Sequence, residues 1–126
     1  MHKSKLGGFI IDCQTDDLDA AASFWSNALG MALRELPGDE GKTYRGLDDT
    51  SHGLDIEVQI VKHESRVHLD IETDNVDAEV ARLEQLGARK VQQVQTWWVM
   101  EAPTGQRFCV VRARSTQFGL TASKWP

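Results

Sequence analysis

The residues best suited to chemistry lie on strand-like segments, whose side chains alternate between two faces. His68 lies between Arg66 and Asp70 on one such segment, and Glu57 and Gln59 share one face of another. An imidazole beside a buried carboxylate would form an acid and base pair. A histidine in this position can equally well hydrogen-bond across the sheet, because a neutral imidazole serves either role.

Aromatic residues on other strand-like segments could add an apolar wall for a ligand. Trp97 and Trp98 are adjacent, so they direct one indole to each face of a strand. We expect Trp98 to face inward with Phe108 and to stack on a planar ligand, while Tyr44 lines the same site. One of the two indoles must pack as core, and a register shift of one residue would exchange them.

The remaining reactive residues have simpler interpretations. Cys13 and Cys109 lie in apolar runs, which is typical of reduced thiols, and Cys109 fits either a small core residue or a thiolate ligand. The acidic stretch at 16–19 lacks the spacing of a calcium loop and is explained by helix capping. His52 and His63 lie in polar loops and are expected to be exposed. The sequence contains no Gly-rich phosphate loop, nucleophile elbow or CxxC pair.

An internal duplication organises these candidates. Residues 11–21 align with residues 69–79 at a constant offset of 58, and five of the eleven positions are identical. Each copy continues into an amphipathic segment that ends in Leu-Gly, at Gly30 and again at Gly87. The chain is therefore interpreted as two related halves.

Each half predicts the order βαβββ. Helices are expected after Asp17 and Asn75, whose side chains can accept hydrogen bonds from the first free amides. The second copy of the first strand alternates apolar Val67, Leu69 and Ile71 with polar residues, so its apolar face should meet a helix. The expected strands are 9–14, 32–36, 43–47 and 55–61 in the first half, and 67–72, 90–95, 97–101 and 107–112 in the second.

Length, composition and charge bound the protein class. The 126 residues predict one domain, with modules at about 7–62 and 66–113 and an aperiodic tail at 114–126 that we expect to be loose or packed against a partner. The 14 basic against 19 acidic residues give a net charge of −5, which argues against nucleic acid as a partner. Since no apolar stretch approaches membrane-spanning or signal-peptide length, we expect a cytoplasmic protein.

The duplicated unit resembles the vicinal oxygen chelate superfamily, which includes glyoxalase I, extradiol dioxygenases, and fosfomycin and bleomycin resistance proteins. The resemblance covers about 7–113, is most specific at 17–31, 66–71 and 98–111, and points to the glyoxalase-like subgroup. It implies an α+β fold in which two tandem βαβββ modules form curved mixed half-sheets around a shared cleft. It also implies a homodimer. The turn Ala-Pro-Thr-Gly-Gln at 102–106 departs from the common Asp-Pro-x-Gly-Asn and lacks a polar group beside the cleft.

Members with a metal place ligands on the first and last strand of each half. The matching positions here are Ile10, Glu57, His68 and Cys109, and isoleucine cannot coordinate an ion. The resemblance therefore favours a metal-independent pocket for a small molecule, as in bleomycin resistance-like members. The expected ligand-binding residues are His68, Glu57, Gln59, Trp98, Phe108, Cys109 and Tyr44. The alternative is a lyase, isomerase or dioxygenase that holds Zn, Ni, Mn or Fe through His68, Glu57 and Cys109.

Overall fold

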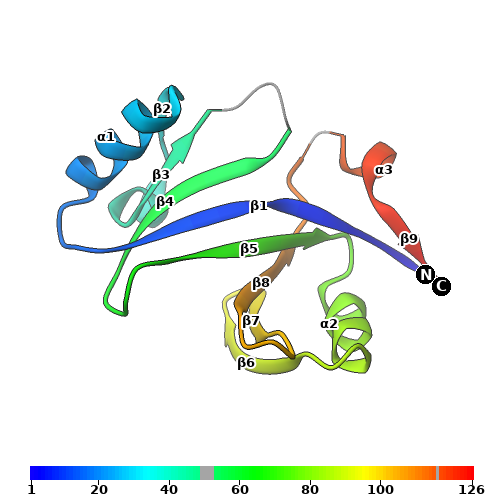
Figure 1. Ribbon diagram of the computed structural model, residues 1–126. Coiled ribbons are helices and arrows are strands. Elements are labelled where there is room, and N and C mark those ends of the chain that lie inside the picture. Colours follow the sequence, from blue (N-terminus) through cyan, green and yellow to red (C-terminus); the bar gives the residue numbers. More distant parts are fainter. Residues whose placement is uncertain (49–52, 116) are drawn as a thin grey trace. The chain divides into compact units, whose positions relative to one another are not determined.

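The computed structural model shows helices and strands in the order that the duplication predicts, divided between two compact units (Figure 1). The structure describes residues 1–48, 53–115 and 117–126. We name Phe9–Val67 the inner unit, and Met1–Gly8 with His68–Pro126 the terminal unit. Since the first strand, β1 (His2–Gln14), crosses this division, it contributes residues to both units. The modules predicted at about 7–62 and 66–113 follow the repeat and stay a prediction.

The inner unit is a sheet with strand order β2-β3-β4-β1 and one α-helix. Its elements after β1 are α1 (Leu18–Leu29), β2 (Leu33–Glu35), the 3-10 helix η1 (Gly38–Lys42), β3 (Tyr44–Leu47) and β4 (Asp55–Val61). Strand β3 pairs antiparallel with both β2 and β4. The core consists of Leu47, Ile56 and Val58, and Ala21 and Trp25 of α1 pack against it.

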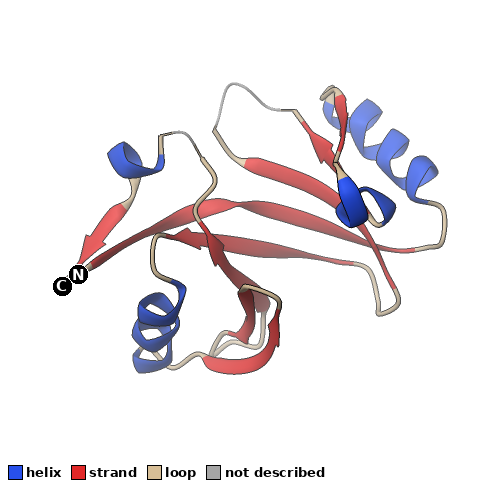
Figure 2. Ribbon diagram, turned by 180° about the vertical axis from the view of Figure 1, so that it is seen from behind, coloured by secondary structure: helices blue, strands red, loops and turns tan. Residues whose placement is uncertain are grey.

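The terminal unit repeats this plan and adds two short elements at the carboxyl end (Figure 2). Its elements are β5 (Arg66–Thr73, which begins in the inner unit), α2 (Val76–Gln85), β6 (Arg89–Val94), β7 (Trp97–Glu101), β8 (Arg107–Arg112), α3 (Phe118–Thr121) and β9 (Ser123–Trp125). Strand β8 pairs parallel with β5 and antiparallel with β7. The core under α2 consists of Val80, Leu83, Met100, Phe108 and Val110. The prediction of an α+β fold with a βαβββ order in each half is confirmed.

Both long helices begin where the capping chemistry predicts. The side chain of Asp17 accepts a hydrogen bond from the amide of Ala20, and that of Asn75 accepts one from Ala78, each at 3.0 Å. Helix α1 ends at Gly30, which adopts the left-handed conformation with φ of 68°. Among the helices in the described residues, none is long and apolar enough to cross a membrane.

The carboxyl-terminal tail is ordered, which corrects the expectation of a loose segment. Strand β9 pairs antiparallel with the start of β1, and the Trp125 indole donates a hydrogen bond of 2.8 Å to the Ser4 hydroxyl. Phe118 of α3 is buried. Strand β1 consequently begins at His2 rather than at residue 9, because β9 provides hydrogen-bonding partners for its first residues. A three-residue strand is too short for sequence periodicity to reveal it.

One face of β5 also differs from the prediction. Val67 and Leu69 are 61% and 48% exposed, whereas Ile71 packs against the core under α2. Helix α2 follows directly after β5 and lies beside its carboxyl end in Figure 1. The expectation that all three apolar residues meet a helix is therefore wrong for Val67 and Leu69, since α2 reaches only the last part of the strand.

Candidate functional site

The polar face of the terminal unit brings together a histidine, an aspartate and a cysteine. His68 and Asp70 are two residues apart on β5, so both point to the same face, and Asp70 is paired with Cys109 on the parallel strand β8. One ligand atom from each residue lies within 4.8 Å of the others. The Nε2 atom of His68 is 3.6 Å from Oδ1 of Asp70, and these side chains are 14% and 20% exposed. The cluster is therefore sheltered yet reachable from solvent.

The aromatic residues predicted to join this site lie on the opposite face of the sheet. Trp98 is paired with the fully buried Val110, whereas Val99 is paired with Cys109. Phe108 belongs to the core under α2, and Trp98 packs against the same core. This corrects the expectation that Trp98 and Phe108 form a wall beside His68. Because adjacent residues of a strand face opposite sides of the sheet, a shift of one residue in the pairing of β7 with β8 decides on which face Trp98 lies.

The polar face extends along β7 through a charged group that the sequence did not single out. The carboxylate of Glu101 accepts hydrogen bonds from Arg89 at 3.0 Å and from Arg107 at 3.1 Å. These two guanidinium groups lower the pKa of Glu101. Glu101 is two residues from Val99, which is paired with Cys109, so Glu101 lies on the same face as Cys109.

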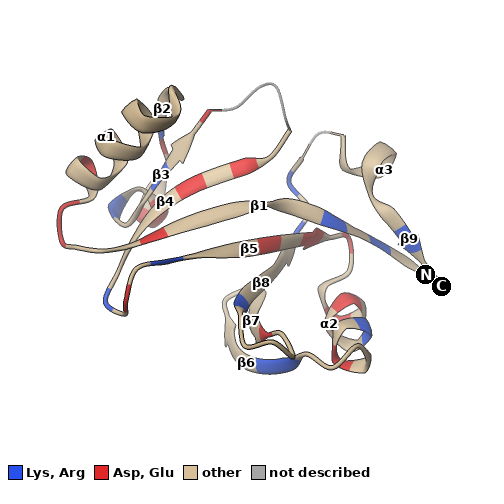
Figure 3. Ribbon diagram, viewed as in Figure 1, with Lys and Arg blue, Asp and Glu red and all other residues tan. Residues whose placement is uncertain are grey.

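In the inner unit, the remaining predicted residues share the face away from α1. Tyr44 is paired with Gln59, and Gly46 with Glu57, while the alternate residues Ile56 and Val58 belong to the core. Glu57 is only 5% exposed. Figure 3 shows acidic residues on both β4 and β5. The common face of Tyr44, Glu57 and Gln59 agrees with the parity argument, whereas their role in ligand binding stays a prediction.

The duplication relates the inner unit to the cluster of the terminal unit. The offset of 58 pairs Ile10 with His68 and Asp12 with Asp70. Ile10 and Asp12 are 4% and 2% exposed, and Asp12 lies 3.9 Å from the Nε atom of Arg66. The two units thus carry equivalent aspartates, buried in the inner unit and partly buried in the terminal unit, but the imidazole occurs in the terminal unit. Asp70 is not among the predicted site residues, although its spacing of two residues from His68 predicts that both side chains share one face of the strand.

The donor set of the terminal unit fits a divalent ion of borderline character. Imidazole, carboxylate and thiolate are all zinc ligands, and three protein ligands with one open position are typical of catalytic zinc sites. The carboxylate that the structure brings to His68 and Cys109 within this unit is Asp70, whereas the predicted Glu57 belongs to the inner unit. If this unit holds a metal ion, the structure therefore supports Asp70 as its carboxylate ligand instead of the predicted Glu57.

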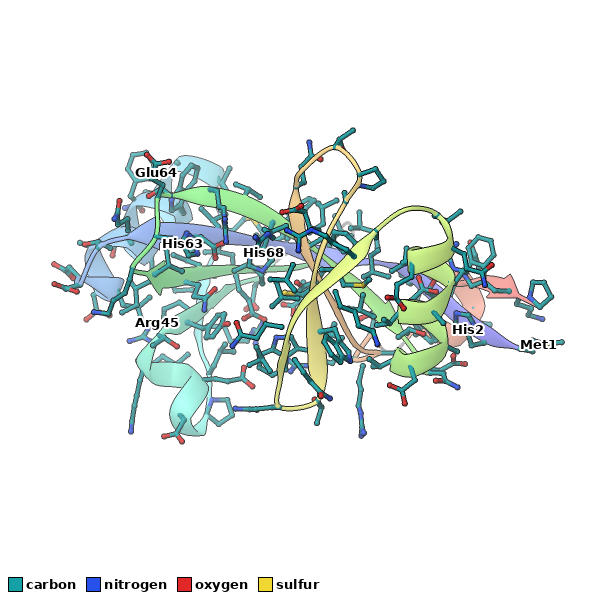
Figure 4. All side chains as sticks on the ribbon, turned by 90° about the horizontal axis from the view of Figure 1, so that it is seen from below. Met1, His2, Arg45, His63, Glu64 and His68 are labelled. Atoms are coloured by element: carbon teal, nitrogen blue, oxygen red, sulfur yellow. The ribbon has the colours of Figure 1, made fainter. Side chains whose placement is uncertain are left out.

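The other candidates lie outside this cluster. His63 is exposed in the turn before β5 (Figure 4), where its Nδ1 atom lies 2.7 Å from the carbonyl oxygen of Glu64. Burial raises the pKa of the Cys13 thiol, which packs against the inner core. Cys13 and Cys109 are free cysteines. His52 lies outside the described residues.

Comparisons with known proteins agree with this architecture. The sequence matches the profile of the family described as Glyoxalase-like domain over residues 8–111. The fold is similar to methylmalonyl-CoA epimerase from Mycobacterium tuberculosis, with a TM-score of 0.59 and 17% identity over 86% of this chain and 90% of that one. A protein described as NAD-dependent benzaldehyde dehydrogenase from Legionella pneumophila gives 0.61 and 13%, covering 83% and 99%.

A third solved structure is a variant of Streptomyces coelicolor methylmalonyl-CoA epimerase in complex with 2-nitronate-propionyl-CoA. Its TM-score is 0.57 at 19% identity, covering 87% of this chain and 98% of that one. No curated protein matches the sequence. The profile confirms the predicted family, and the solved structures, at such low identity, show the fold alone.

Proposed function

Since the chain belongs to the glyoxalase-like domain family, we propose that it binds a small organic molecule on the polar face of the terminal unit, without a metal ion. The observation that carries this proposal is the grouping of His68, Asp70 and Cys109 within 4.8 Å of one another. A partly buried imidazole next to a carboxylate can donate, accept and relay a proton to a polar ligand.

We propose a site without a metal because the ligand positions of the two halves differ. Ile10 occupies the place that His68 occupies in the second copy, and its side chain has no donor atom. The Nε2 atom of His68 lies 3.6 Å from the Asp70 carboxylate, so a carboxylate of the protein already lies next to the imidazole. Two relatives by fold support a small-molecule ligand, because they are methylmalonyl-CoA epimerases whose structures hold CoA compounds.

A divalent metal centre is the second candidate, and the same cluster favours it. His68, Asp70 and Cys109 would hold the ion, which would supply Lewis-acid chemistry to a bound oxygen atom. In that case the three side chains would act as ligands, and proton transfer would pass to other residues. The two candidates therefore assign different tasks to the His68 imidazole.

Chemical denaturation with and without metal separates the two candidates. A metal that binds the native state must stabilise it. We expect no shift of the denaturation midpoint with Zn²⁺, Ni²⁺ or Mn²⁺. A shift that disappears in both His68→Ala and Asp70→Asn, and persists in the loop control His63→Ala, would replace the metal-independent proposal by the metal centre.

Ligand-observed NMR with a fragment library tests binding itself. Fragments that bind the polar face should lose affinity in both His68→Ala and Asp70→Asn, while the His63→Ala control behaves as wild type. A screen in which no fragment depends on either residue would contradict the proposal. Chemical shifts of labelled cysteine give an independent readout, because only Cys109 lies in the cluster.

Two further properties accompany this proposal. A homodimer is supported by exposed apolar residues on the inner unit, where Phe24 is 61%, Leu29 48% and Leu33 43% exposed. Sedimentation that yields only a species of 14.1 kDa at every concentration would contradict it. A cytoplasmic location is supported by the two free cysteines, since thiols persist in a reducing compartment.

A further inference from the structure

A second pocket lies on the opposite face of the terminal unit, beside the start of α2. It has a volume of about 650 Å³, and its walls include Asp74, Asp77, Trp98 and Arg112 together with the amides of Gln93 and Gln95. Trp98 is paired with the buried Val110, so it belongs to the α2 side of the sheet. This pocket is therefore separate from the His68 cluster.

The internal duplication shows which residue of the inner unit corresponds to Trp98. Val58 lies five residues after Gly53, and Val110 lies five residues after Gly105. Both glycines have positive φ, and both valines are fully buried. Arg45 is paired with Val58 in the first half, and Trp98 is paired with Val110 in the second. Arg45 and Trp98 thus occupy equivalent positions under the start of the helix in each unit.

In the inner unit, this position holds a guanidinium group against the first turn of α1. Arg45 donates a hydrogen bond of 3.2 Å to the carboxylate of Asp19, and also bonds the carbonyl oxygens of Gly41 and Tyr44. The corresponding depression there is lined by residues 15–19 and by Arg45 itself. In the inner unit, the carboxylate of Asp19 therefore already has a guanidinium partner supplied by the protein.

In the terminal unit, the carboxylate is retained and the arginine is not. The offset of 58 makes Asp77 the equivalent of Asp19, and Asp77 likewise lies in the first turn of its helix. Within the described residues, the Asp77 carboxylate has no hydrogen-bond or ion-pair partner, and it is exposed to the pocket. Trp98 stands at the strand position that Arg45 occupies in the inner unit.

The Trp98 ring itself attracts cations. The ammonium group of Lys90 lies 4.9 Å from the ring centroid. Asp74 and Asp77 line the pocket against a single cation, Arg112, so the ionised lining residues favour a positive ligand. A planar guanidinium can stack on an indole and donate two parallel hydrogen bonds to a carboxylate, which an ammonium cannot do.

We propose that this pocket binds a small organic guanidinium compound between the Asp77 carboxylate and the Trp98 ring. The ligand supplies from solution the group that Arg45 supplies to the equivalent place in the inner unit. Gln93 and Gln95 offer amide oxygens to its remaining N–H donors. This site does not depend on the function proposed for the His68 cluster.

Isothermal titration with ethylguanidinium, and with the neutral isostere ethylurea, tests the proposal on the full chain. Ethylguanidinium should bind at least about tenfold more tightly than ethylurea, because both donate N–H hydrogen bonds but only the guanidinium carries a charge opposite to that of the Asp77 carboxylate. Equal binding of the two compounds, or of neither, would overturn it. The Trp98 indole resonance in a ¹⁵N-labelled protein should shift with the same midpoint, and a shift of the other indoles alone would contradict it.

Three variants locate the bound group. Asp77→Asn should weaken ethylguanidinium binding by about tenfold or more, whereas Asp19→Asn, the matched change in the inner unit, should leave it unchanged. Trp98→Arg should abolish binding, since it places a guanidinium of the chain next to Asp77. If Trp98→Arg does not fold, the pair Asp77→Asn and Asp19→Asn still decides, and equal binding by both would refute the site.

Discussion

Glu79 is a fully buried carboxylate that links three parts of the terminal unit, and its replacement should destabilise the protein strongly. Its Oε1 atom lies 2.8 Å from Nε2 of His2 on β1, and both oxygens accept bonds of 2.8 Å from Arg82 one turn later on α2. The Arg82 guanidinium in turn lies 3.9 Å from the ring centroid of Trp125 on β9. Figure 4 shows His2 beside α2.

The magnitude follows from what Glu79→Ala would leave behind. Removing one partner of a buried ion pair costs about 3–5 kcal/mol when the other charge stays buried. The Arg82 side chain is 25% exposed and can turn toward water, whereas His2 is 6% exposed and would lose its partner in place. We therefore expect the lower end, about 3 kcal/mol. For 126 residues, an unfolding entropy of about 2.1 cal/mol/K per residue converts this to about 11 °C in melting temperature.

Thermal melts followed by circular dichroism measure this loss. Glu79→Gln keeps the shape and part of the hydrogen bonding, so it should melt between wild type and Glu79→Ala. Glu84→Gln on the exposed side of the same helix is the control and should melt within about 2 °C of wild type, as is usual for surface changes. A Glu79→Ala protein that melts as the Glu84→Gln control does would refute the reasoning.

The pH dependence gives a second test of the same carboxylate. Burial alone would raise the pKa of Glu79, but hydrogen bonds from Arg82, His2 and Ser4 outweigh it and lower the pKa. A lowered pKa means that the stabilisation is complete above the ordinary glutamate value and is lost as the pH falls through the folded value. The melting difference between wild type and Glu79→Gln should therefore be constant from about pH 7 to about pH 5 and shrink below about pH 4.

Two further changes test the tail and the helix caps. Trp125→Ala removes the indole bond to Ser4 and the ring over Arg82, so it should lower the free energy of unfolding by about 2 kcal/mol in urea melts, while Lys124→Ala, exposed on the same strand, should have little effect. Asp17→Ala and Asn75→Ala each remove a side-chain bond to a helix amide and should cost about 1 kcal/mol, with Asp16→Ala as the exposed control. Equal losses in variant and control would contradict either expectation.

Much of the fold could be predicted from local chemistry. The helix starts follow from the oxygen of Asp17 and of Asn75, and the strands of each half follow from alternation between turns. The tail could not be predicted in this way, because Trp125 is ordered by contacts with Ser4 and Arg82, far away in the chain. Long-range partners of that kind have no local signature.

The candidate site was predictable in its polar half and not in its aromatic half. Residues at i and i+2 of one strand share a face, which is enough to place His68 with Asp70 and Glu57 with Gln59. The face that carries Trp98 depends on the pairing of β7 with β8, and the sequence leaves both registers open. Only the burial of Val110 opposite Trp98 decides between them.

The duplication itself explains why the unusual chemistry collects in the terminal unit. Three repeat-related pairs differ in kind, namely Ile10 and His68, Ala21 and Glu79, and Arg45 and Trp98. In the first two pairs, the structure supplies a partner for the group in the second copy: Asp70 for His68, and His2 with Arg82 for Glu79. For Trp98 and the adjacent Asp77 the chain supplies Lys90 to the ring alone, and the carboxylate has no partner within the described residues. The proposed guanidinium ligand would pair with this carboxylate as Arg45 pairs with Asp19 in the inner unit.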